Sequence, residues 1–282
     1  YASKDEAVQV QGTSEEDRIV TGAGNDTILG SAGADTISAG AGTDTVDYSN
    51  SEGPVSVNLA EGAGDGGDAT GDRYEGVENI IGTRGDDKLV GDDGDNVLTG
   101  GEGADYLSGG RGFDTADYSA SEEGVYVNLS EGFGKGGDAT GDVLESIENV
   151  IGSAGDDTLI GDAGDNVIAG GQGADVLVGG EGNDTADYSA SKEGVYVSLA
   201  DGYGKGGDAD GDKLDSIENV RGSANDDIFS GSSADNVITG GDGSDTLILT
   251  GNYSDYLITY DDKTQAFTIT DMRKGSPDGT DT

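Results

Sequence analysis

A nine-residue pattern repeats through most of the chain and constrains its fold more than any other feature. Residues 21–29 and 30–38 read TGAGNDTIL and GSAGADTIS, with glycine fourth, aspartate sixth and isoleucine eighth in both. Further copies follow in residues 39–47, 82–117, 152–187 and 222–248, and a divergent copy stands at 12–20. A short period of this kind predicts a solenoid, in which each repeat unit packs only against its neighbours.

The fifteen nonapeptides agree at three places. The eighth residue is apolar in all fifteen, the sixth is Asp in twelve and Asn in three, and the fourth is Gly in twelve. A turn needs an aspartate only occasionally, so this regularity favours ligand-binding aspartates over a glycine-rich solenoid whose aspartates only form turns. The candidate metal ligands are Asp17, Asp26, Asp35, Asp44, Asp87, Asn96, Asp105, Asp114, Asp157, Asn166, Asp175, Asp184, Asp227, Asn236 and Asp245.

The residue types of the pattern suit calcium. Ca²⁺ binds about six to eight oxygen atoms, from carboxylates and backbone carbonyls. Glycine reaches positive φ and lets several carbonyls point into one turn. The three residues after each aspartate are expected to form a short strand whose central side chain points inward. Two such half-turns make one coil, and stacked coils make an all-β parallel β-roll. The glycines expected at the metal sites are Gly22, Gly24, Gly33, Gly42, Gly85, Gly94, Gly103, Gly112, Gly155, Gly164, Gly173, Gly182 and Gly243.

The pattern G-G-x-G-x-D-x-U-x resembles the calcium-binding nonapeptide of RTX (haemolysin-type) proteins, which are exported by type I secretion. The resemblance implies several Ca²⁺ ions, each between same-side turns of adjacent coils. Because asparagine keeps an oxygen but lacks the charge, its sites are expected to be weaker unless the neighbouring Asp95 and Asp165 compensate. The implied pairs are Asp26 with Asp44, Asp87 with Asp105, Asp157 with Asp175, Asp227 with Asp245, Asn96 with Asp114, and Asn166 with Asp184.

The sequence also repeats with a longer period of 70 residues, in which an insertion follows each block of four nonapeptides. The first insertion comprises about 25 residues, 48–72, and residues 73–81 are expected to resume the nine-residue beat with Glu78 in sixth place. Alternating Val55, Val57 and Leu59 predict a strand, and a loop rich in Gly and Asp follows it.

Acidic residues recur at fixed places of the insertions and are candidates for additional calcium ligands, with solvated acidic loops as the alternative. Tyr48, Tyr118 and Tyr188 are expected to pack the insertions onto the roll, and a ligand-stacking role for them, or for Phe133 and Tyr203, is the alternative. The candidate additional ligands are Asp68, Asp72, Asp138, Asp142, Asp208, Asp212, Glu78, Glu148 and Glu218.

These periods predict a roll in three to four blocks, with insertions and a C-terminal β segment. That last segment resembles the one that follows the repeats in RTX proteins, and the resemblance implies that it is truncated and lacks the family's secretion signal. The predicted parts are an N-terminal edge (1–11), repeat blocks (12–47, 82–117, 152–187 and 222–248), insertions with their Glu-Asn turns (48–81, 118–151 and 188–221) and the C-terminal segment (249–282).

Composition limits the partners. Fourteen basic and 58 acidic residues give a net charge of −44, which excludes nucleic acid and anionic membranes as electrostatic partners. No stretch approaches the roughly 20 apolar residues of a membrane-spanning helix, so no membrane insertion is expected. High charge with low hydrophobicity is typical of a chain that stays unfolded until cations neutralise its carboxylates. The chain begins at Tyr1 without a signal peptide, as expected of a piece of a longer protein.

Three functional hypotheses remain. The first is a non-enzymatic RTX module that binds Ca²⁺ and folds outside the cell as part of a large exported bacterial protein. The second is an adhesive repeat of a surface protein that binds a glycan or another cell. The third is a region tied to polysaccharide chemistry, either a non-catalytic module or itself catalytic. The absence of His and Cys excludes catalytic sites that need either residue, whereas a carboxylate pair stays open.

Overall fold

The structure is a computed structural model that describes residues 6–261, 263–264, 266–275 and 277–282. Within these residues almost every strand is three residues long, and the only helices are short 3₁₀ turns. Those turns are η1 (Gly67–Ala69), η2 (Gly137–Ala139), η3 (Gly207–Ala209) and η4 (Tyr253–Asp255). The chain divides into two compact units, residues 1–151 and 152–282.

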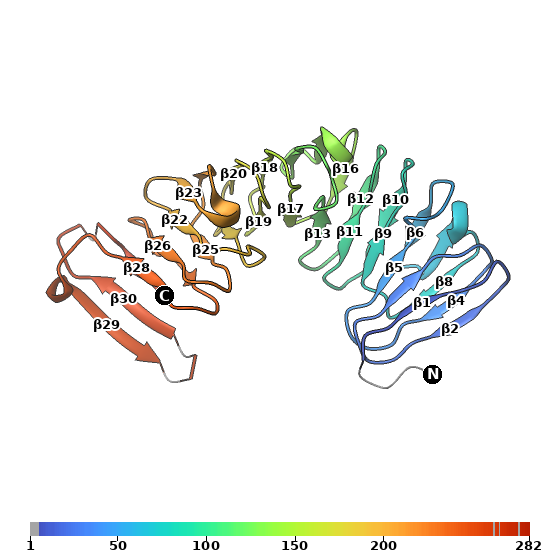
Figure 1. The fold of residues 1–282 in the computed structure, drawn as a ribbon, viewed down its shortest axis with the longest axis horizontal. Helices are drawn as coiled ribbons and strands as arrows, with labels where there is room; N and C mark the ends of the chain where they lie inside the picture. The colour runs from blue at the N-terminus through green and yellow to red at the C-terminus, as the bar shows by residue number, and fades with distance from the viewer. Residues whose placement is uncertain (1–5, 262, 265, 276) are drawn as a thin grey trace. The chain divides into compact units, whose positions relative to one another are not determined.

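The first unit contains two sheets that face each other, sheet A and sheet B. In Figure 1 the strands β5, β9, β11 and β13 lie side by side in sheet A, whose described strands are all parallel. Sheet A contains, in spatial order, β1 (Gln9–Gln11), β3 (Thr27–Leu29), β5 (Thr45–Asp47), β9 (Asn79–Ile81), β11 (Val97–Thr99), β13 (Thr115–Asp117) and β17 (Asn149–Ile151). Sheet B contains β2 (Arg18–Val20), β4 (Thr36–Ser38), β8 (Arg73–Glu75), β7 (Ala63–Asp65), β6 (Ser56–Asn58), β10 (Lys88–Val90), β12 (Tyr106–Ser108), β16 (Val143–Glu145), β15 (Phe133–Lys135) and β14 (Tyr126–Asn128).

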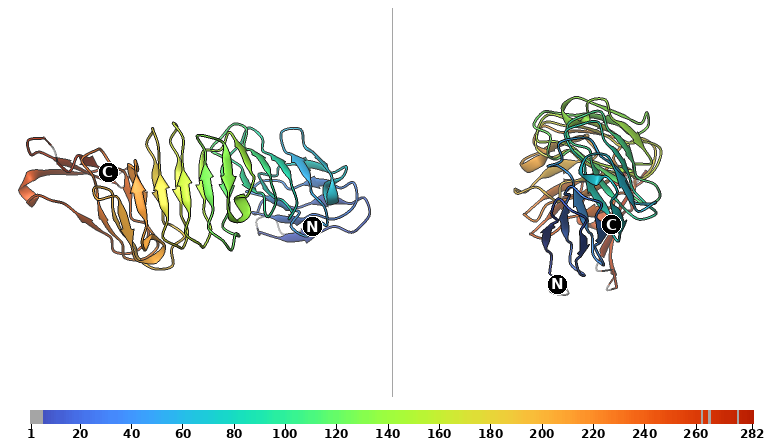
Figure 2. Two further views of the ribbon diagram at one scale, coloured as in Figure 1. Left: turned by 90° about the horizontal axis from the view of Figure 1, so that it is seen from above. Right: turned by 90° about the vertical axis from the view of Figure 1, so that its right-hand side faces the viewer.

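The second unit repeats this arrangement, and Figure 2 shows its short strands lying side by side as successive rungs. Its sheet A contains β19 (Val167–Ala169), β21 (Thr185–Asp187), β25 (Asn219–Arg221) and β27 (Ile238–Thr239). Its sheet B contains β18 (Thr158–Ile160), β20 (Val176–Val178), β24 (Lys213–Asp215), β23 (Tyr203–Lys205), β22 (Tyr196–Ser198), β26 (Ile228–Ser230) and β28 (Thr246–Ile248).

The core of each unit is thin, because each three-residue strand contributes a single side chain to it. In a three-residue strand only the middle side chain faces the opposite sheet, because successive side chains alternate. That middle residue is the apolar eighth residue of the nonapeptide. Ile28, Val46, Ile80 and Leu98 of sheet A are fully buried and lie directly opposite one another in consecutive strands. The structure therefore confirms the predicted parallel β-roll.

Each insertion adds strands to sheet B. The predicted strand around Val57 is β6, which pairs in parallel with β10 and antiparallel with β7. Strand β7 then meets β8, so two strands lie between β8 and β10, whereas β9 and β11 are direct neighbours in sheet A. At about 4.8 Å per strand, the insertion widens sheet B by roughly 10 Å relative to sheet A. The insertion is thus part of the sheet rather than a loop outside it.

Residues 73–81 differ from the prediction of one nonapeptide. Ile80 lies inward in β9, as expected, but residues 73–75 form the additional strand β8. Only Gly76, Val77 and Glu78 connect these two strands, in place of the six residues of an ordinary turn. The roll therefore resumes with Asp72 in sixth place, six residues before the predicted Glu78, and the short turn of three residues still leaves Ile80 facing inward.

The recurring tyrosines pack the insertions, as predicted. Tyr118 is 2 % exposed, and its hydroxyl donates to Asp142 Oδ2 at 2.9 Å. Tyr188 and Asp212 form the same contact at 2.9 Å in the second unit. Phe133 is half-buried and stacks on Tyr126 with ring centroids 5.8 Å apart.

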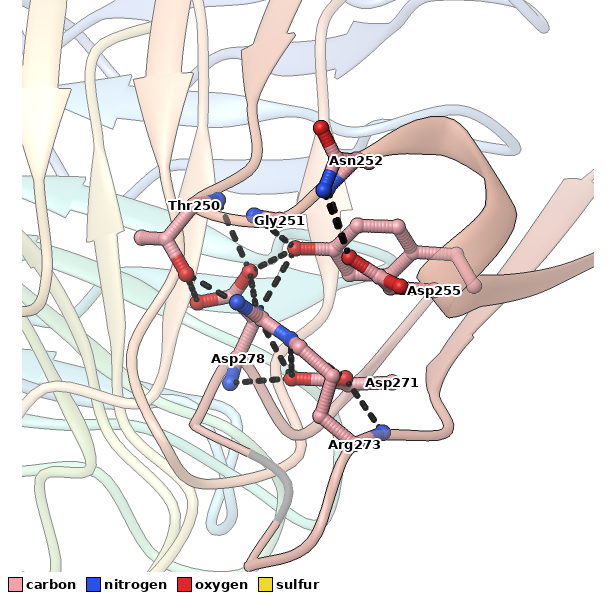
Figure 3. A network of polar contacts seen from close by, with 8 residues as sticks. Thr250, Gly251, Asn252, Asp255, Asp271, Arg273 and Asp278 are labelled. Atoms are coloured by element: carbon pink, nitrogen blue, oxygen red, sulfur yellow. Dashed lines mark hydrogen bonds and ion pairs between the residues drawn. The ribbon is translucent and has the colours of Figure 1, made fainter.

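The C-terminal segment forms a third sheet of β29 (Tyr256–Asp261), β30 (Ala266–Asp271) and β31 (Thr280–Asp281). The predicted C-terminal β segment is therefore a hairpin of β29 and β30 with β31 as a third strand. Figure 3 shows the polar network behind the hairpin, in which Arg273 bridges Asp271 and Asp278 at 2.8 and 2.7 Å.

Candidate metal centre

The sixth-place residues line the two edges of the roll, where one sheet turns into the other. Those that precede strands of sheet A form edge A, and those that precede strands of sheet B form edge B. On edge A the backbone N–H of Asp26 donates to Asp44 Oδ1 at 2.7 Å. On edge B the N–H of Asp87 donates to Asp105 Oδ1 at 2.8 Å. Each carboxylate is therefore held against the half-turn one coil before it.

The structure brings together all six residue pairs that the repeat spacing implied. In each pair the N–H of the first residue donates to Oδ1 of the second. Besides the two pairs above, this contact joins Asp157 with Asp175, Asp227 with Asp245, Asn96 with Asp114, and Asn166 with Asp184, at 2.8 to 3.0 Å. Asp17 and Asp35 are joined in the same way at 2.9 Å.

The candidate residues of the insertions divide into two groups. Asp72 continues edge B, because its Oδ1 accepts the N–H of Asp35 at 2.8 Å. Asp142 and Asp212 accept from Asp105 and Asp175 in the same manner at 2.9 Å. The second group stays off the edge stacks, since Asp68, Asp138 and Asp208 lie half-exposed in the 3₁₀ turns.

The three glutamates of the Glu-Asn turns continue edge A. Glu78 Oε2 accepts the N–H of Asp44 at 2.8 Å, and Glu148 and Glu218 accept from Asp114 and Asp184 at 2.9 and 3.0 Å. A longer side chain is needed there because the turn of Gly76 to Glu78 is three residues shorter than the others.

In some half-turns Oδ2 of the sixth-place carboxylate accepts a backbone N–H, and in others this oxygen is free, meaning that it has no hydrogen-bond partner. Asp87 Oδ2 accepts the N–H of Thr83 at 2.5 Å, and Asp157 Oδ2 accepts the N–H of Ser153 at 2.6 Å. The next carboxylate along the stack has a buried Oδ2 without any hydrogen-bond partner. The free oxygens on the repeats are Oδ2 of Asp44, Asp105, Asp114, Asp175 and Asp184. Every one belongs to a pair described above. In three of these pairs the partner is an aspartate whose Oδ2 accepts a backbone N–H, whereas Asp114 and Asp184 are paired with the amides of Asn96 and Asn166.

The second residue of the nonapeptide determines whether Oδ2 of the sixth-place carboxylate is free. Where Oδ2 is free, this residue is a glycine with positive φ, such as Gly101 at +95° before Asp105. Most side chains cannot adopt that conformation without strain. The glycine also admits a carbonyl from the coil before, because a Cβ on Gly101 would lie 2.1 Å from the oxygen of Thr83. A Cβ on Gly179 would lie 2.4 Å from the free Oδ2 of Asp184 and 2.0 Å from the carbonyl oxygen of Ser216, so a free carboxylate oxygen and a backbone carbonyl lie close together there.

Burial without a counter-charge raises the pKa of the free carboxylates. Loss of hydration, together with neighbouring carboxylates, raises the pKa of Asp105 and of Asp175 to about 8. The pKa values of Asp114 and Asp184 rise to about 6 for the same reasons. A buried ionised carboxylate costs several kcal/mol unless a cation or hydrogen bonds compensate it. The donor set, with carboxylates beside carbonyls, fits the hard oxygen ligands that Ca²⁺ takes.

The backbone group that each asparagine faces explains why three nonapeptides have Asn in sixth place. Asn96 Nδ2 donates to the carbonyl of Glu78 at 2.8 Å, and Asn236 Nδ2 donates to that of Glu218 at 2.7 Å. At other places the preceding half-turn offers an N–H, as Asp26 does to Asp44. The short Glu turn offers a carbonyl instead, so the next sixth-place residue must be a donor. Asn follows every Glu turn for this reason.

Within the described residues no three Asp or Glu side chains converge on one point. The oxygen donors that lie on these edges are single carboxylates or pairs of them, beside backbone carbonyls.

Two features of the site escaped the sequence analysis. One is the glycine at second place, which marks the half-turns with a free carboxylate oxygen. These glycines are Gly40, Gly101, Gly110, Gly171 and Gly180; Gly241 shares the positive φ, but Asp245 of its half-turn is exposed. The other is Asp281, whose buried Oδ1 is also free. Its signal is the string DGTDT at 278–282, which repeats the G-x-D-T of Gly24 to Thr27.

Comparison with protein families identifies the repeat itself. The family model for the RTX calcium-binding nonapeptide repeat matches four segments, residues 11–46, 81–116, 151–186 and 221–253. A comparison with curated proteins found no match. The described part of the chain holds no helix with the length and apolar character that a membrane crossing requires.

Proposed function

Since the chain belongs to the RTX calcium-binding nonapeptide repeat family, we propose that the two edges of its roll hold the Ca²⁺ ions and that their binding folds the chain outside the cell. The chain is a calcium-binding structural repeat module that takes several ions. The proposal concerns which residues bind them and when. The four predicted repeat blocks supply most of the edge residues, and the insertions add the aspartates and glutamates that continue the two edges, namely Asp72, Asp142, Asp212, Glu78, Glu148 and Glu218.

The observation that carries the proposal is the set of buried carboxylate oxygens without a hydrogen-bond partner. Five of them recur at the same place of the repeat, and that of Asp184 lies close to the carbonyl oxygen of Ser216. The ligands would come from Asp87 and Asp105 on edge B, from Asn96 and Asp114 on edge A, and from their equivalents along both edges. A bound Ca²⁺ would supply the positive charge that these oxygens lack. The chain's own contribution is to hold the oxygens in place through its N–H to carboxylate contacts.

Folding then depends on the Ca²⁺ concentration around the chain, which differs between the cytosol and the outside of the cell. Without cations, a net charge of −44 opposes compaction, and the buried carboxylates add several kcal/mol of desolvation cost. Metal binding free energy becomes folding free energy in such a chain. Extracellular calcium modules have Kd values of about 10⁻⁴–10⁻³ M, far above cytosolic Ca²⁺. The chain would therefore pass a secretion channel unfolded and fold at the cell surface or in the medium, where it supports the rest of its parent protein.

A calcium titration followed by far-UV circular dichroism tests this function. We expect a cooperative transition from coil to β-sheet between about 0.1 and 1 mM Ca²⁺, reversed by chelator. Mg²⁺, which prefers rigid octahedral sites, and NaCl at matched ionic strength should leave the chain largely unfolded. A β-sheet spectrum that persists in chelator would refute the export switch.

A second function, adhesion to a cell-surface glycan, is favoured by a specific cluster on the outer face of sheet B. Tyr126 stacks on Phe133, and Lys135 Nζ lies 3.9 Å from the Tyr126 ring centroid. Tyr196, Tyr203 and Lys205 repeat this cluster in the second unit. The first insertion has Ser56, Ala63 and Asp65 at these places. Half-buried rings offer apolar faces to sugars, and two copies add avidity.

The first insertion supplies the matched replacement for testing adhesion. Changing Tyr126→Ser, Phe133→Ala and Lys135→Asp, with the equivalent changes at 196, 203 and 205, should abolish retention on immobilised cell-surface polysaccharide. The calcium-dependent circular dichroism should persist. Tyr253→Ser serves as control, because Tyr253 is an isolated aromatic residue with 83 % exposure. Retention that survives all six changes would rule out the clusters as the contact surface.

A further inference from the structure

The last four residues, Gly279–Thr282, lie on the roll although the nine-residue beat ends more than 30 residues earlier. We call these residues the tail. Asp281 forms a parallel bridge with Asn236, 45 residues before it. The N–H of Thr282 donates to the carbonyl of Asn236 at 2.9 Å, and the N–H of Ile238 donates to the carbonyl of Thr282 at 2.8 Å. The tail thus occupies the place of the next half-turn on edge A.

The contacts of the tail match those of an authentic half-turn. In the first unit the half-turn of Asp114 lies on that of Asn96, and Thr115 N–H donates to the Asn96 carbonyl at 2.8 Å, as Thr282 does to Asn236. Phe113 N–H donates to Asp95 Oδ1 at 2.8 Å, and the corresponding contact from Thr280 to Asp235 is 3.0 Å.

The glycine contact matches as well. A Cβ on Gly112 would lie 2.6 Å from the carbonyl oxygen of Gly94, and a Cβ on Gly279 would lie 2.2 Å from that of Ala234. Both glycines have positive φ. The carbonyl that faces the edge site is therefore present beneath the tail.

Like several carboxylates of the repeats, Asp281 is buried with one oxygen that has no hydrogen-bond partner. It is 2 % exposed, one oxygen receives the N–H of Asn236, and Oδ1 has no partner. Asp235 and Asp278 lie nearby and add negative charge. A Cβ on Gly231 would lie 2.9 Å from Asn236 Oδ1 and 3.0 Å from Asp281 Oδ2, which places both side-chain oxygens on the same side of this turn.

We propose that Asp281 and the Asn236 half-turn form a further Ca²⁺ site that fastens the C-terminal sheet to the end of the roll. The site rests on the proposed calcium binding of the edges. It differs from every repeat site because its two halves come from separate parts of the chain. Ion binding there closes a loop of 45 residues, whereas a repeat pair closes one of 18.

The tail connects the ion to the hairpin. Asp281 and Thr280 pair with Ile269 and Thr270 of β30, so the tail is the third strand of the C-terminal sheet. Just before the tail, Asp278 joins the network of Tyr256 and Arg273 shown in Figure 3.

Apolar packing between the hairpin and the roll is incomplete. A cavity of about 510 Å³ lies between them, lined on the roll side by Phe229 and Leu247 and on the hairpin side by Phe267 and Ile269. Ile238 and Leu247 of the last rungs are only half-buried, unlike the core residues further back. Since this packing is open, a bound ion at Asp281 would be a principal tie between the two parts.

Asp281→Asn removes the charge with little change in shape and is the test variant. Native mass spectrometry at saturating Ca²⁺ should count one ion fewer than in the wild-type chain. Hydrogen exchange of β29 and β30 should lose its calcium-dependent protection at least tenfold, while β18, β20 and β24 stay protected. Asp261→Asn, an exposed acid on the same hairpin, should change neither quantity.

Tyr256→Phe distinguishes a lost ligand from a loosened hairpin. It removes the hydroxyl that contacts Asp278 and Arg273 but leaves Asp281 in place. We expect faster exchange in β29 and an unchanged number of ions. An unchanged ion count in Asp281→Asn, or the same loss in Tyr256→Phe, would overturn the C-terminal site. A wild-type chain that binds no Ca²⁺ would instead refute the proposed function as a whole.

Discussion

Asp105→Asn is expected to weaken calcium-dependent folding and, at the same time, to stabilise the calcium-free chain. Asp105 is 1 % exposed, and its Oδ2 has no hydrogen-bond partner. With Ca²⁺ present, the variant loses the charge of a ligand, so the folding midpoint should move to at least tenfold higher Ca²⁺, equivalent to about 1.4 kcal/mol. In chelator, the variant no longer buries an uncompensated charge, whose cost is several kcal/mol. A purely structural aspartate would give destabilisation under both conditions.

Urea unfolding in Ca²⁺ with a Ca²⁺ titration measures the first effect, and the TMAO concentration needed to fold the chain in chelator measures the second. Asp93→Asn is the control, because the side chain of Asp93 is 80 % exposed and its ion pair with Arg111 lies at the surface. Surface ion pairs contribute about 0–1 kcal/mol, so this variant should follow the wild-type chain closely. Equal shifts in the two variants would mean that net charge, rather than a site at Asp105, controls folding.

The fold could be predicted from the sequence because one short unit determines it. Glycine, aspartate and an apolar residue at fixed places specify turn, ligand and core, and the beat supplies the parallel stacking. The route of the insertions could not be predicted. Alternation at Val55, Val57 and Leu59 indicates a strand, but the pairing of β6 with β10 depends on which edge of sheet B is free. Sequence patterns record which side chains face inward, and they leave the choice of partner strand open.

The sequence predicted which residues of the candidate site lie in pairs, but only the structure revealed which of their carboxylate oxygens lack a hydrogen-bond partner. The 18-residue spacing brings Asp87 to Asp105, as expected. Which oxygen is free depends on whether Thr83 or Gly101 stands four residues earlier, a backbone property that the aspartates alone do not reveal. Asp281 was missed because it lies outside the beat, so its pairing with Asn236 follows only from the return of the C-terminal sheet to the roll.

Gly101→Ala is expected to be among the most damaging single changes in the chain. Gly101 has φ of +95°, and a Cβ would lie 2.1 Å from the carbonyl oxygen of Thr83. The left-handed conformation costs a residue with a side chain about 1–2 kcal/mol, and overpacking against backbone adds about 1–3 kcal/mol. The carbonyl cannot move away freely, because it lies between two half-turns of edge B. We therefore expect a loss of about 2–5 kcal/mol in calcium-saturated stability, measured by urea unfolding.

Two other glycines separate the causes of that loss. Gly275 also has positive φ, +90°, but a Cβ there would meet nothing within 4 Å, so Gly275→Ala should cost only the conformational part, about 1–2 kcal/mol. Gly53 has neither constraint, and Gly53→Ala should be neutral or stabilising by up to about 1 kcal/mol. If Gly101→Ala cost no more than Gly275→Ala, the carbonyl of Thr83 would not be in contact with Gly101. The close approach of consecutive half-turns, on which every edge site depends, would then be wrong.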